Sequence, residues 1–127
     1  MAGCTKNACR VMKDPVPLSI RLDLPGGSRF GPGKAELLGQ IDQTGSISAA
    51  ARALNMSYPR ALKLVKAMNV QFNAALVETY QGGDRHGGAR LTPLGHEIFN
   101  IYQEINRQSA QANTAALKAM ARLCAKV

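Results

Sequence analysis

The stretch from residue 46 to residue 73 constrains the fold of this chain more than any other part. Its first half, residues 48–54, is rich in alanine, and small side chains let a second helix approach closely. Asn55 tolerates a left-handed backbone and can therefore end this first helix. Ser57 is a favourable N-cap for a second helix, and Pro59 would fall in its first turn, where a missing N–H costs little. The sequence therefore predicts two helices joined by a tight turn.

The predicted second helix has an apolar face and a basic face. The apolar face recurs at helical spacing and comprises Ala61, Leu62, Val65, Met68 and Phe72. The charged side chains off this face are all positive: Arg60, Lys63 and Lys66. This pattern is typical of a DNA-binding helix-turn-helix, whose second helix enters the major groove. The alternative is an ordinary helical hairpin with a solvated basic face, but the uniform charge and Tyr58 at the helix start favour DNA.

Net charge supports a polyanionic partner. The 127 residues include 16 Lys and Arg against 8 Asp and Glu, which gives a net charge of +8. Nucleic acid is the first candidate, and an acidic membrane surface is the second.

No apolar run approaches the ~20 residues of a membrane span, and the N-terminus lacks the apolar core of a secretory signal. The three cysteines, Cys4, Cys9 and Cys124, follow no disulfide or zinc pattern. We therefore expect reduced thiols, no metal site and a cytoplasmic location.

Before this motif, the sequence predicts a disordered leader, a strand and a helix. Residues 1–14 are polar and basic and are expected to form a disordered leader. In residues 16–24 the apolar side chains alternate with polar ones, which predicts a strand with one buried face. A helix is expected over residues 33–43, with Leu37, Leu38 and Ile41 on its apolar face.

A second hairpin is predicted after the motif. Residues 75–81 and 89–92 have the pattern of strands, and the segment 82–88 between them is rich in glycine. This segment lacks the Lys-Ser/Thr ending of a phosphate-binding P-loop. We interpret the hairpin as the wing of a winged helix, with Arg85 reaching DNA. A solvated turn is the alternative.

The C-terminal part is predicted to be one long helix. Thr92 is a suitable N-cap and Pro93 a suitable first residue. Leu94, Ile98, Ile101 and Ile105 start an apolar stripe that continues to Leu123. Over residues 93–125 such a helix would be about 50 Å long, more than a three-helix core can cover. We therefore expect residues 15–92 to be a winged helix-turn-helix domain and residues 93–127 to mediate dimerisation.

The whole pattern resembles the N-terminal DNA-binding domain of the molybdate-dependent ModE regulators. The similarity lies in residues 45–54, Met56-Ser57-Tyr58, Met68-Asn69 and residues 87–95, and it covers about residues 16–105. LysR-type regulators have a similar first domain. The resemblance implies a winged helix, a dimer formed by flanking helices, and transcriptional repression or activation. ModE proteins continue into a molybdate-binding module, for which this chain has no room. We therefore expect a stand-alone DNA-binding member with no cofactor of its own and a possible separate effector-binding protein.

The predicted fold class is mainly α with a small β-hairpin: a winged helix-turn-helix with a long C-terminal dimerisation helix. The predicted function is a DNA-binding transcriptional regulator, a repressor that binds a palindromic operator in double-stranded DNA as a homodimer. The expected DNA-binding residues are Ser57, Tyr58, Arg60, Lys63, Lys66, Arg85 and Arg90. The first four would face the major groove and the last three would hold phosphates. The alternative is a winged-helix protein-interaction module for an acidic protein partner. No catalytic constellation predicts an enzyme.

Overall fold

The computed structural model describes residues 16–82 and 85–125, and it describes no side chains from 82 to 87. The chain divides into two units. Residues 20–103 form the larger unit, and the segments on either side of it form the other.

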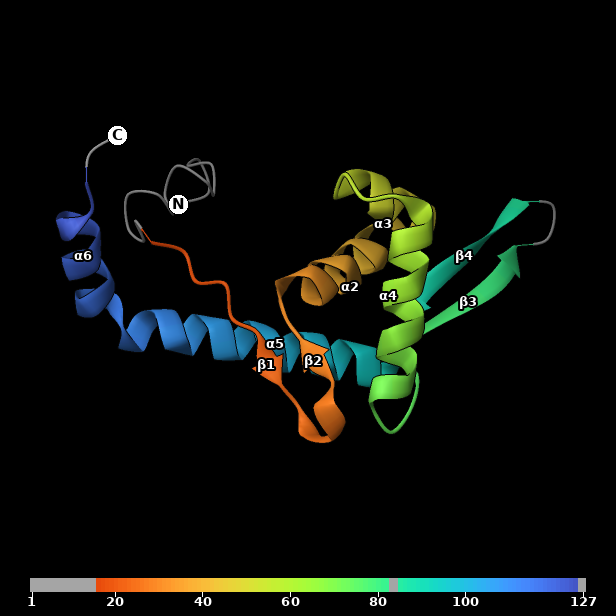
Figure 1. Cartoon of the computed structure of the whole chain (residues 1–127). Helices are drawn as coiled ribbons and strands as arrows, with labels where there is room; N and C mark the ends of the chain where they lie inside the picture. The colour runs from red at the N-terminus through yellow and green to blue at the C-terminus, as the bar shows by residue number, and fades with distance from the viewer. Residues whose placement is uncertain (1–15, 83–84, 126–127) are drawn as a thin grey trace. The chain divides into compact units, whose positions relative to one another are not determined.

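The larger unit contains two hairpins and a group of helices (Figure 1). The first hairpin comprises β1 (Leu22–Asp23), the 3-10 turn η1 (Pro25–Gly27) and β2 (Arg29–Phe30). Three helices follow: α2 (Pro32–Thr44), α3 (Ile47–Ala53) and α4 (Tyr58–Gln71). The second hairpin pairs β3 (Val77–Gly82) with β4 (Arg85–Leu91) in antiparallel register and leads into α5 (Pro93–Ala112). A last helix, α6 (Thr114–Leu123), follows α5.

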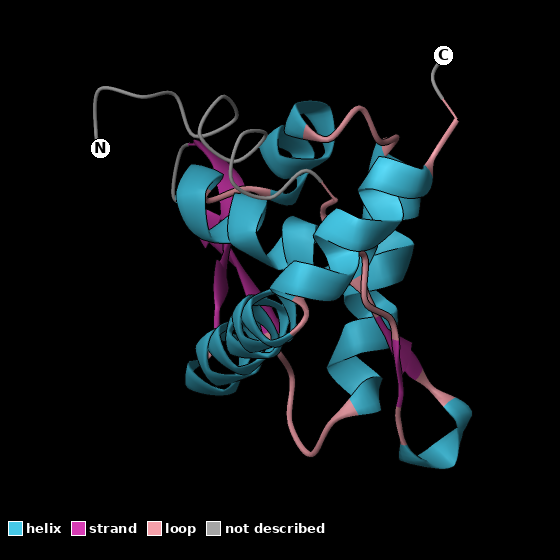
Figure 2. Ribbon diagram, turned by 90° about the vertical axis from the view of Figure 1, so that its left-hand side faces the viewer, coloured by secondary structure: helices cyan, strands magenta, loops and turns pink. Residues whose placement is uncertain are grey.

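The fold is mainly helical with two short hairpins, as Figure 2 shows, and the predicted fold class is confirmed. Local capping explains where α3 and α5 begin. Ser46 Oγ accepts a hydrogen bond from the backbone N–H of Ala49 at 2.9 Å, and Thr92 Oγ1 accepts one from Gly95 N–H at 3.0 Å. Each cap satisfies a backbone donor that has no partner inside the first turn of its helix. Helices α2, α3, α4 and α5 start where the sequence predicts, within one residue.

The core of the larger unit is aliphatic with an aromatic cluster. Phe30 of β2 meets Phe72 and Tyr102 edge to face, at ring-centroid distances of 6.1 and 5.3 Å. Phe30 and Tyr102 are 2% and 3% exposed. The cluster joins β2, the end of α4 and α5, so the first hairpin is part of the core. Ala50 and Ala51 of α3 are buried, as their spacing predicts.

The strand predicted over residues 16–24 is mostly wrong, although its burial pattern is right. Exposure alternates along residues 17–24, but only Leu22 and Asp23 pair with another strand. The partner strand β2 ends at Phe30 because Pro32 begins α2 two residues later, so no longer ladder can form. Instead, the hydroxyl of Tyr102 donates a hydrogen bond to the carbonyl of Ile20. The predicted leader, residues 1–14, lies outside the described residues.

The single helix predicted over residues 93–125 is also wrong, because the helix breaks at Asn113. Asn113 has φ −110° and ψ 17°, and its Nδ2 donates to the carbonyl of Ser109 at 2.8 Å. Thr114 Oγ1 donates to the carbonyl of Ala110 at 3.1 Å. Asn and Thr side chains compete in this way for backbone groups that a continuous helix would use. The apolar stripe is shifted too: Ile101 is 49% exposed, whereas its neighbour Tyr102 is buried.

Candidate nucleic-acid interface

The turn between α3 and α4 has a geometry that the sequence predicts. Asn55 adopts φ 55°, a left-handed conformation that Asn tolerates. The backbone N–H of Met56 donates to the carbonyl of Ala51 at 2.9 Å, and the Met56 side chain packs against the core. Ser57 Oγ then accepts from the N–H of Arg60 at 3.2 Å and caps α4. These bonds fix the direction in which α4 leaves the turn.

Helix α4 presents a cationic face to solvent. Arg60, Lys63 and Lys66 are exposed, while Ala61, Val65 and Met68 are buried on the opposite side. Tyr58 in the first turn is 48% exposed. Among the described residues, no carboxylate forms a salt bridge with these three cations. The face can therefore bind an anionic surface without first breaking a described ion pair.

The far end of α4 is held by polar contacts. Asn69 Oδ1 accepts from the backbone N–H groups of Leu76 and Val77 at 2.8 and 3.0 Å, and Asn69 Nδ2 donates to the carbonyl of Val77 at 3.0 Å. Three backbone groups at the start of β3 are thus satisfied by one side chain. Asn69 therefore fixes the position of the second hairpin relative to α4.

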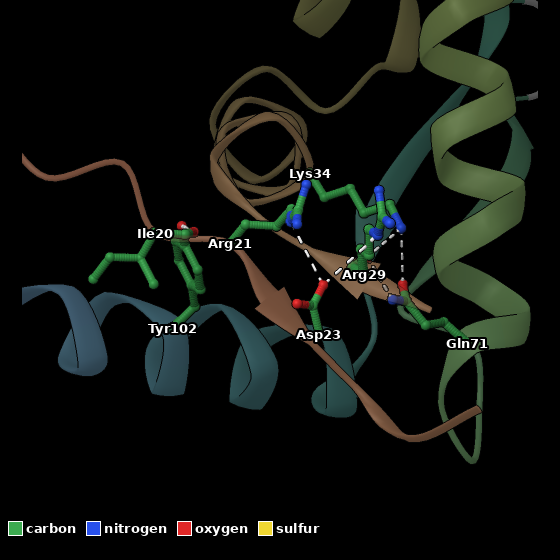
Figure 3. A network of polar contacts seen from close by, with 7 residues as sticks. All are labelled: Ile20, Arg21, Asp23, Arg29, Lys34, Gln71 and Tyr102. Carbon is green, nitrogen blue, oxygen red and sulfur yellow. Dashed lines mark hydrogen bonds and ion pairs between the residues drawn. The ribbon is translucent and has the colours of Figure 1, made fainter. Parts of the chain in front are cut away.

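A second set of contacts joins α4 to the first hairpin (Figure 3). Gln71 Nε2 and Lys34 Nζ both donate to the carbonyl of Arg29 at 2.6 Å, and Lys34 Nζ also donates to Gln71 Oε1 at 3.2 Å. Burial lowers the pKa of Lys34. Asp23 Oδ1 lies 3.5 and 3.6 Å from the Nε atoms of Arg21 and Arg29. The bonds that Gln71 makes with the Arg29 carbonyl and with Lys34 hold the end of α4 to the first hairpin and to α2.

The base half of the second hairpin is fixed by several contacts. The N–H of Ala89 donates to the carbonyl of Gly45 at 2.9 Å, which joins β4 to the turn between α2 and α3. Near the base, Thr92 Oγ1 donates to the carbonyl of Ala75 at 2.7 Å. A Cβ atom at Gly95 would lie 2.1 Å from the carbonyl oxygen of Leu76, so α5 approaches this backbone as only glycine allows. The hairpin therefore projects from a rigid base.

Arg90 lies on this hairpin, but it is already engaged. Its Nε donates to Glu78 Oε2 at 2.8 Å, and its guanidinium carbon lies 5.1 Å from the ring centre of Tyr80. The hydrogen bond to Glu78 raises the pKa of Arg90. Arg85 is the first residue of β4, and its side chain lies outside the described part of the structure.

A groove separates the hairpin from α3 and the start of α4. Its volume is about 1080 Å³. It is lined by Ser46, Ile47, Ser48, Arg52, Tyr58, Leu62, Thr79, Tyr80, Gln81, Gly88 and Ala89. Of the residues predicted to bind DNA whose side chains the structure describes, only Tyr58 lines it. Ser48, Arg52 and Tyr80 were missed, although Ser48 and Arg52 are four residues apart, opposite the buried alanines of α3, and that spacing could have indicated them.

The described part of the chain offers few other candidate functional features. Among the side chains that the structure describes, over residues 16–81 and 88–125, no three from His, Cys, Asp or Glu gather in a way that could hold a metal ion. His96 Nε2 lies 3.9 Å from Asp42 Oδ1, with both side chains half exposed. No helix in these ranges is both long and apolar enough to cross a bilayer.

Comparison with known proteins identifies the class of this domain. Residues 34–96, from α2 to the start of α5, match the model of the bacterial regulatory helix-turn-helix protein, lysR family. The structure is similar to that of the CbnR DNA-binding domain, solved in complex with DNA, with a TM-score of 0.55 and 20% identity. That likeness covers 69% of this chain and 95% of the other. Residues 34–96 therefore form a regulatory helix-turn-helix domain, and domains of this kind bind DNA.

Individual proteins show a closer similarity to this chain. The chain is 44% identical over 79 residues to the molybdenum-pterin-binding protein MopB of Rhodobacter capsulatus. The aligned region covers 62% of this chain and 29% of MopB. The chain is also 37% identical over 71 residues to the DNA-binding transcriptional dual regulator ModE of Escherichia coli K12. This aligned region covers 56% of this chain and 27% of ModE. The predicted resemblance to the DNA-binding part of ModE is confirmed. The match spans less than a third of either relative.

Proposed function

We propose that this protein is a DNA-binding transcriptional regulator that uses α4 to read the major groove of double-stranded DNA. The observation that carries the proposal is the cationic exposed face of α4 within a regulatory helix-turn-helix domain. The net charge of +8 suits a polyanion and raises the rate of association with it. Regulation of bacterial genes in this way takes place in the cytoplasm.

We place the base-reading residues in the first turns of α4. Tyr58, Arg60 and Lys63 are exposed there, where recognition side chains of helix-turn-helix proteins meet base edges. Ser57 contributes its hydroxyl proton, since its oxygen already accepts from Arg60 N–H. Lys66 and Arg85 contact phosphates, which orient the protein but carry no sequence information.

The protein acts as a homodimer that represses transcription from a palindromic operator. Exposed apolar side chains on α5 and α6 support self-association: Ile101, Met120 and Leu123 are 49%, 66% and 85% exposed. Exposed apolar surface is typical of protein–protein contact sites where it is contiguous. A two-fold axis is the usual way for identical subunits to close a pair, and it would place one recognition helix in each half of a palindrome.

Molybdenum is the proposed physiological context, because the names of the relatives MopB and ModE refer to it. We assign molybdate to no residue of the described part of the chain. A separate effector-binding protein could supply the signal.

The test is selection of bound duplexes from a random DNA library with the full chain, in the presence and absence of molybdate. We expect enrichment of an inverted repeat. Binding that is independent of sequence would contradict the proposal. Absence of DNA binding together with capture of an acidic protein would favour a winged-helix interaction module instead.

A further inference from the structure

The groove between the second hairpin and helices α3 and α4 has the chemistry of a phosphodiester site. Its hydroxyl and amide side chains come from Ser46, Ser48, Tyr58, Thr79, Tyr80 and Gln81. Arg52 is the charged residue among the described lining residues, and no carboxylate is among them. One cation with several neutral hydrogen-bond donors matches the sugar-phosphate backbone of a DNA strand, which carries one negative charge per nucleotide.

Helical spacing places Lys66 of the cationic face next along the side of α4 that lines the groove. Tyr58 and Leu62 line it, and Lys66 follows them at the same spacing of four residues. Residues at i, i+4 and i+8 lie along one side of a helix, so Lys66 extends the wall formed by Tyr58 and Leu62. A DNA strand that passes along this side of α4 would therefore meet Arg52 and Lys66 in succession.

Tyr80 forms the opposite wall of the groove and is held in a fixed orientation. A Cβ atom at Gly88 would lie 2.6 Å from both Cζ and Oη of Tyr80, so the ring rests on the bare backbone of its cross-strand partner. The Arg90 guanidinium lies over the ring, and Glu78 holds the guanidinium. Even so, the Tyr80 side chain remains 45% exposed. An aromatic side chain that is both fixed and exposed is typical of a contact residue.

We propose that one strand of the bound duplex lies in this groove, with Arg52 and Tyr80 contacting its backbone from opposite walls, and that Arg90 is a positioning residue for Tyr80. This proposal rests on the proposed function. It changes the role predicted for Arg90, because the guanidinium expected to contact a phosphate instead lies between Glu78 and the Tyr80 ring.

The first experiment compares Arg52→Ala with Arg21→Ala in the full chain. Both arginines are exposed and each substitution removes one positive charge, but Arg21 does not line the groove. Arg21 pairs with Asp23, and Asp23 keeps Arg29 as a partner when Arg21 is removed. Arg52→Ala should weaken binding about tenfold on selected and random duplexes alike, and should reduce the slope of log K against log salt by about 0.9 for each bound chain. Equal effects of the two substitutions would overturn the assignment of Arg52.

The second experiment uses nitration of tyrosine by tetranitromethane as a footprint. The chain has three tyrosines, and Tyr102 is an internal control because it is 3% exposed. We expect DNA to protect both Tyr58 and Tyr80. Tyr80 that nitrates equally fast with and without DNA would overturn the groove as the strand site.

The role of Arg90 is tested with Arg90→Gln. If Arg90 positions Tyr80, the free variant should nitrate faster at Tyr80 and bind DNA several-fold more weakly, with an unchanged salt slope. A slope reduced by about 0.9 with unchanged nitration would show a phosphate contact instead. Wild-type protein that binds no duplex at all would disprove the proposed function. Wild-type binding that the Arg52 substitution leaves intact would disprove only this inference.

Discussion

At the scale of single residues, two glycines in helices offer a matched test of packing. Gly95→Ala would place a Cβ atom 2.1 Å from the carbonyl oxygen of Leu76, whereas Gly33→Ala would meet nothing within 4 Å. Overpacking of this kind costs about 1–3 kcal/mol, while alanine at an unstrained glycine position stabilises by about 0.4–1 kcal/mol. Urea denaturation should therefore show opposite changes in the free energy of unfolding. A loss of the same size in both variants would contradict the close approach at Gly95.

Arg60 provides a residue-scale test of base reading. It is exposed in the first turn of α4, off the buried face. Arg60→Ala should weaken binding to the selected duplex by about 1–3 kcal/mol if the guanidinium contacts a base edge. The measurement is the dissociation constant on selected and random duplexes at one salt concentration. An equal loss on both would identify a phosphate contact.

At the scale of elements, the end of α5 and α6 should serve association rather than folding. The buried core cluster ends at Tyr102, and α6 contains no buried residue. Deletion of residues 109–127 should therefore leave the larger unit folded but weaken dimerisation. Sedimentation analysis should show a shift towards monomer, while the thermal midpoint at low concentration should change little. An unchanged dimer would place the association surface elsewhere.

At the scale of the whole molecule, a dimer with one recognition helix per subunit should bind half-sites about 34–36 Å apart, or a multiple of that distance. Binding should also fall steeply with salt, because each phosphate contact releases condensed counterions. Lys66, Arg85 and Arg52 from each chain would make six contacts and a slope of about −5 in log K against log salt. Titrations at several salt concentrations on inverted and direct repeats would measure both. A flat salt response, or equal binding to direct repeats of any spacing, would be inconsistent with the dimer.

The motif could be predicted from sequence because its signals are local. Asn55 adopts a left-handed conformation and Ser57 caps α4, and each depends on only a few neighbouring residues. The faces of α4 follow from helical spacing in the same way. The strand predicted over residues 16–24 is too long because alternation of apolar and polar residues predicts a buried face but does not supply a pairing partner. The C-terminal helix is predicted too long because the apolar spacing continues past Asn113, where side-chain bonds to backbone carbonyls interrupt the helix.

The sequence by itself determined the order of the elements, the turn of the motif, the cationic face of α4 and the resemblance to ModE regulators. Each of these depends on residue type at short spacing, where backbone preference and helical period dominate. Only the tertiary structure decided that Arg90 is held by Glu78 and that Arg52 and Tyr80 line one groove. Arg52 and Tyr80 are 28 residues apart in the sequence, so their proximity depends on the packing of the hairpin against α2 and on its bond to the turn before α3. Local sequence patterns carry no information about such distant contacts.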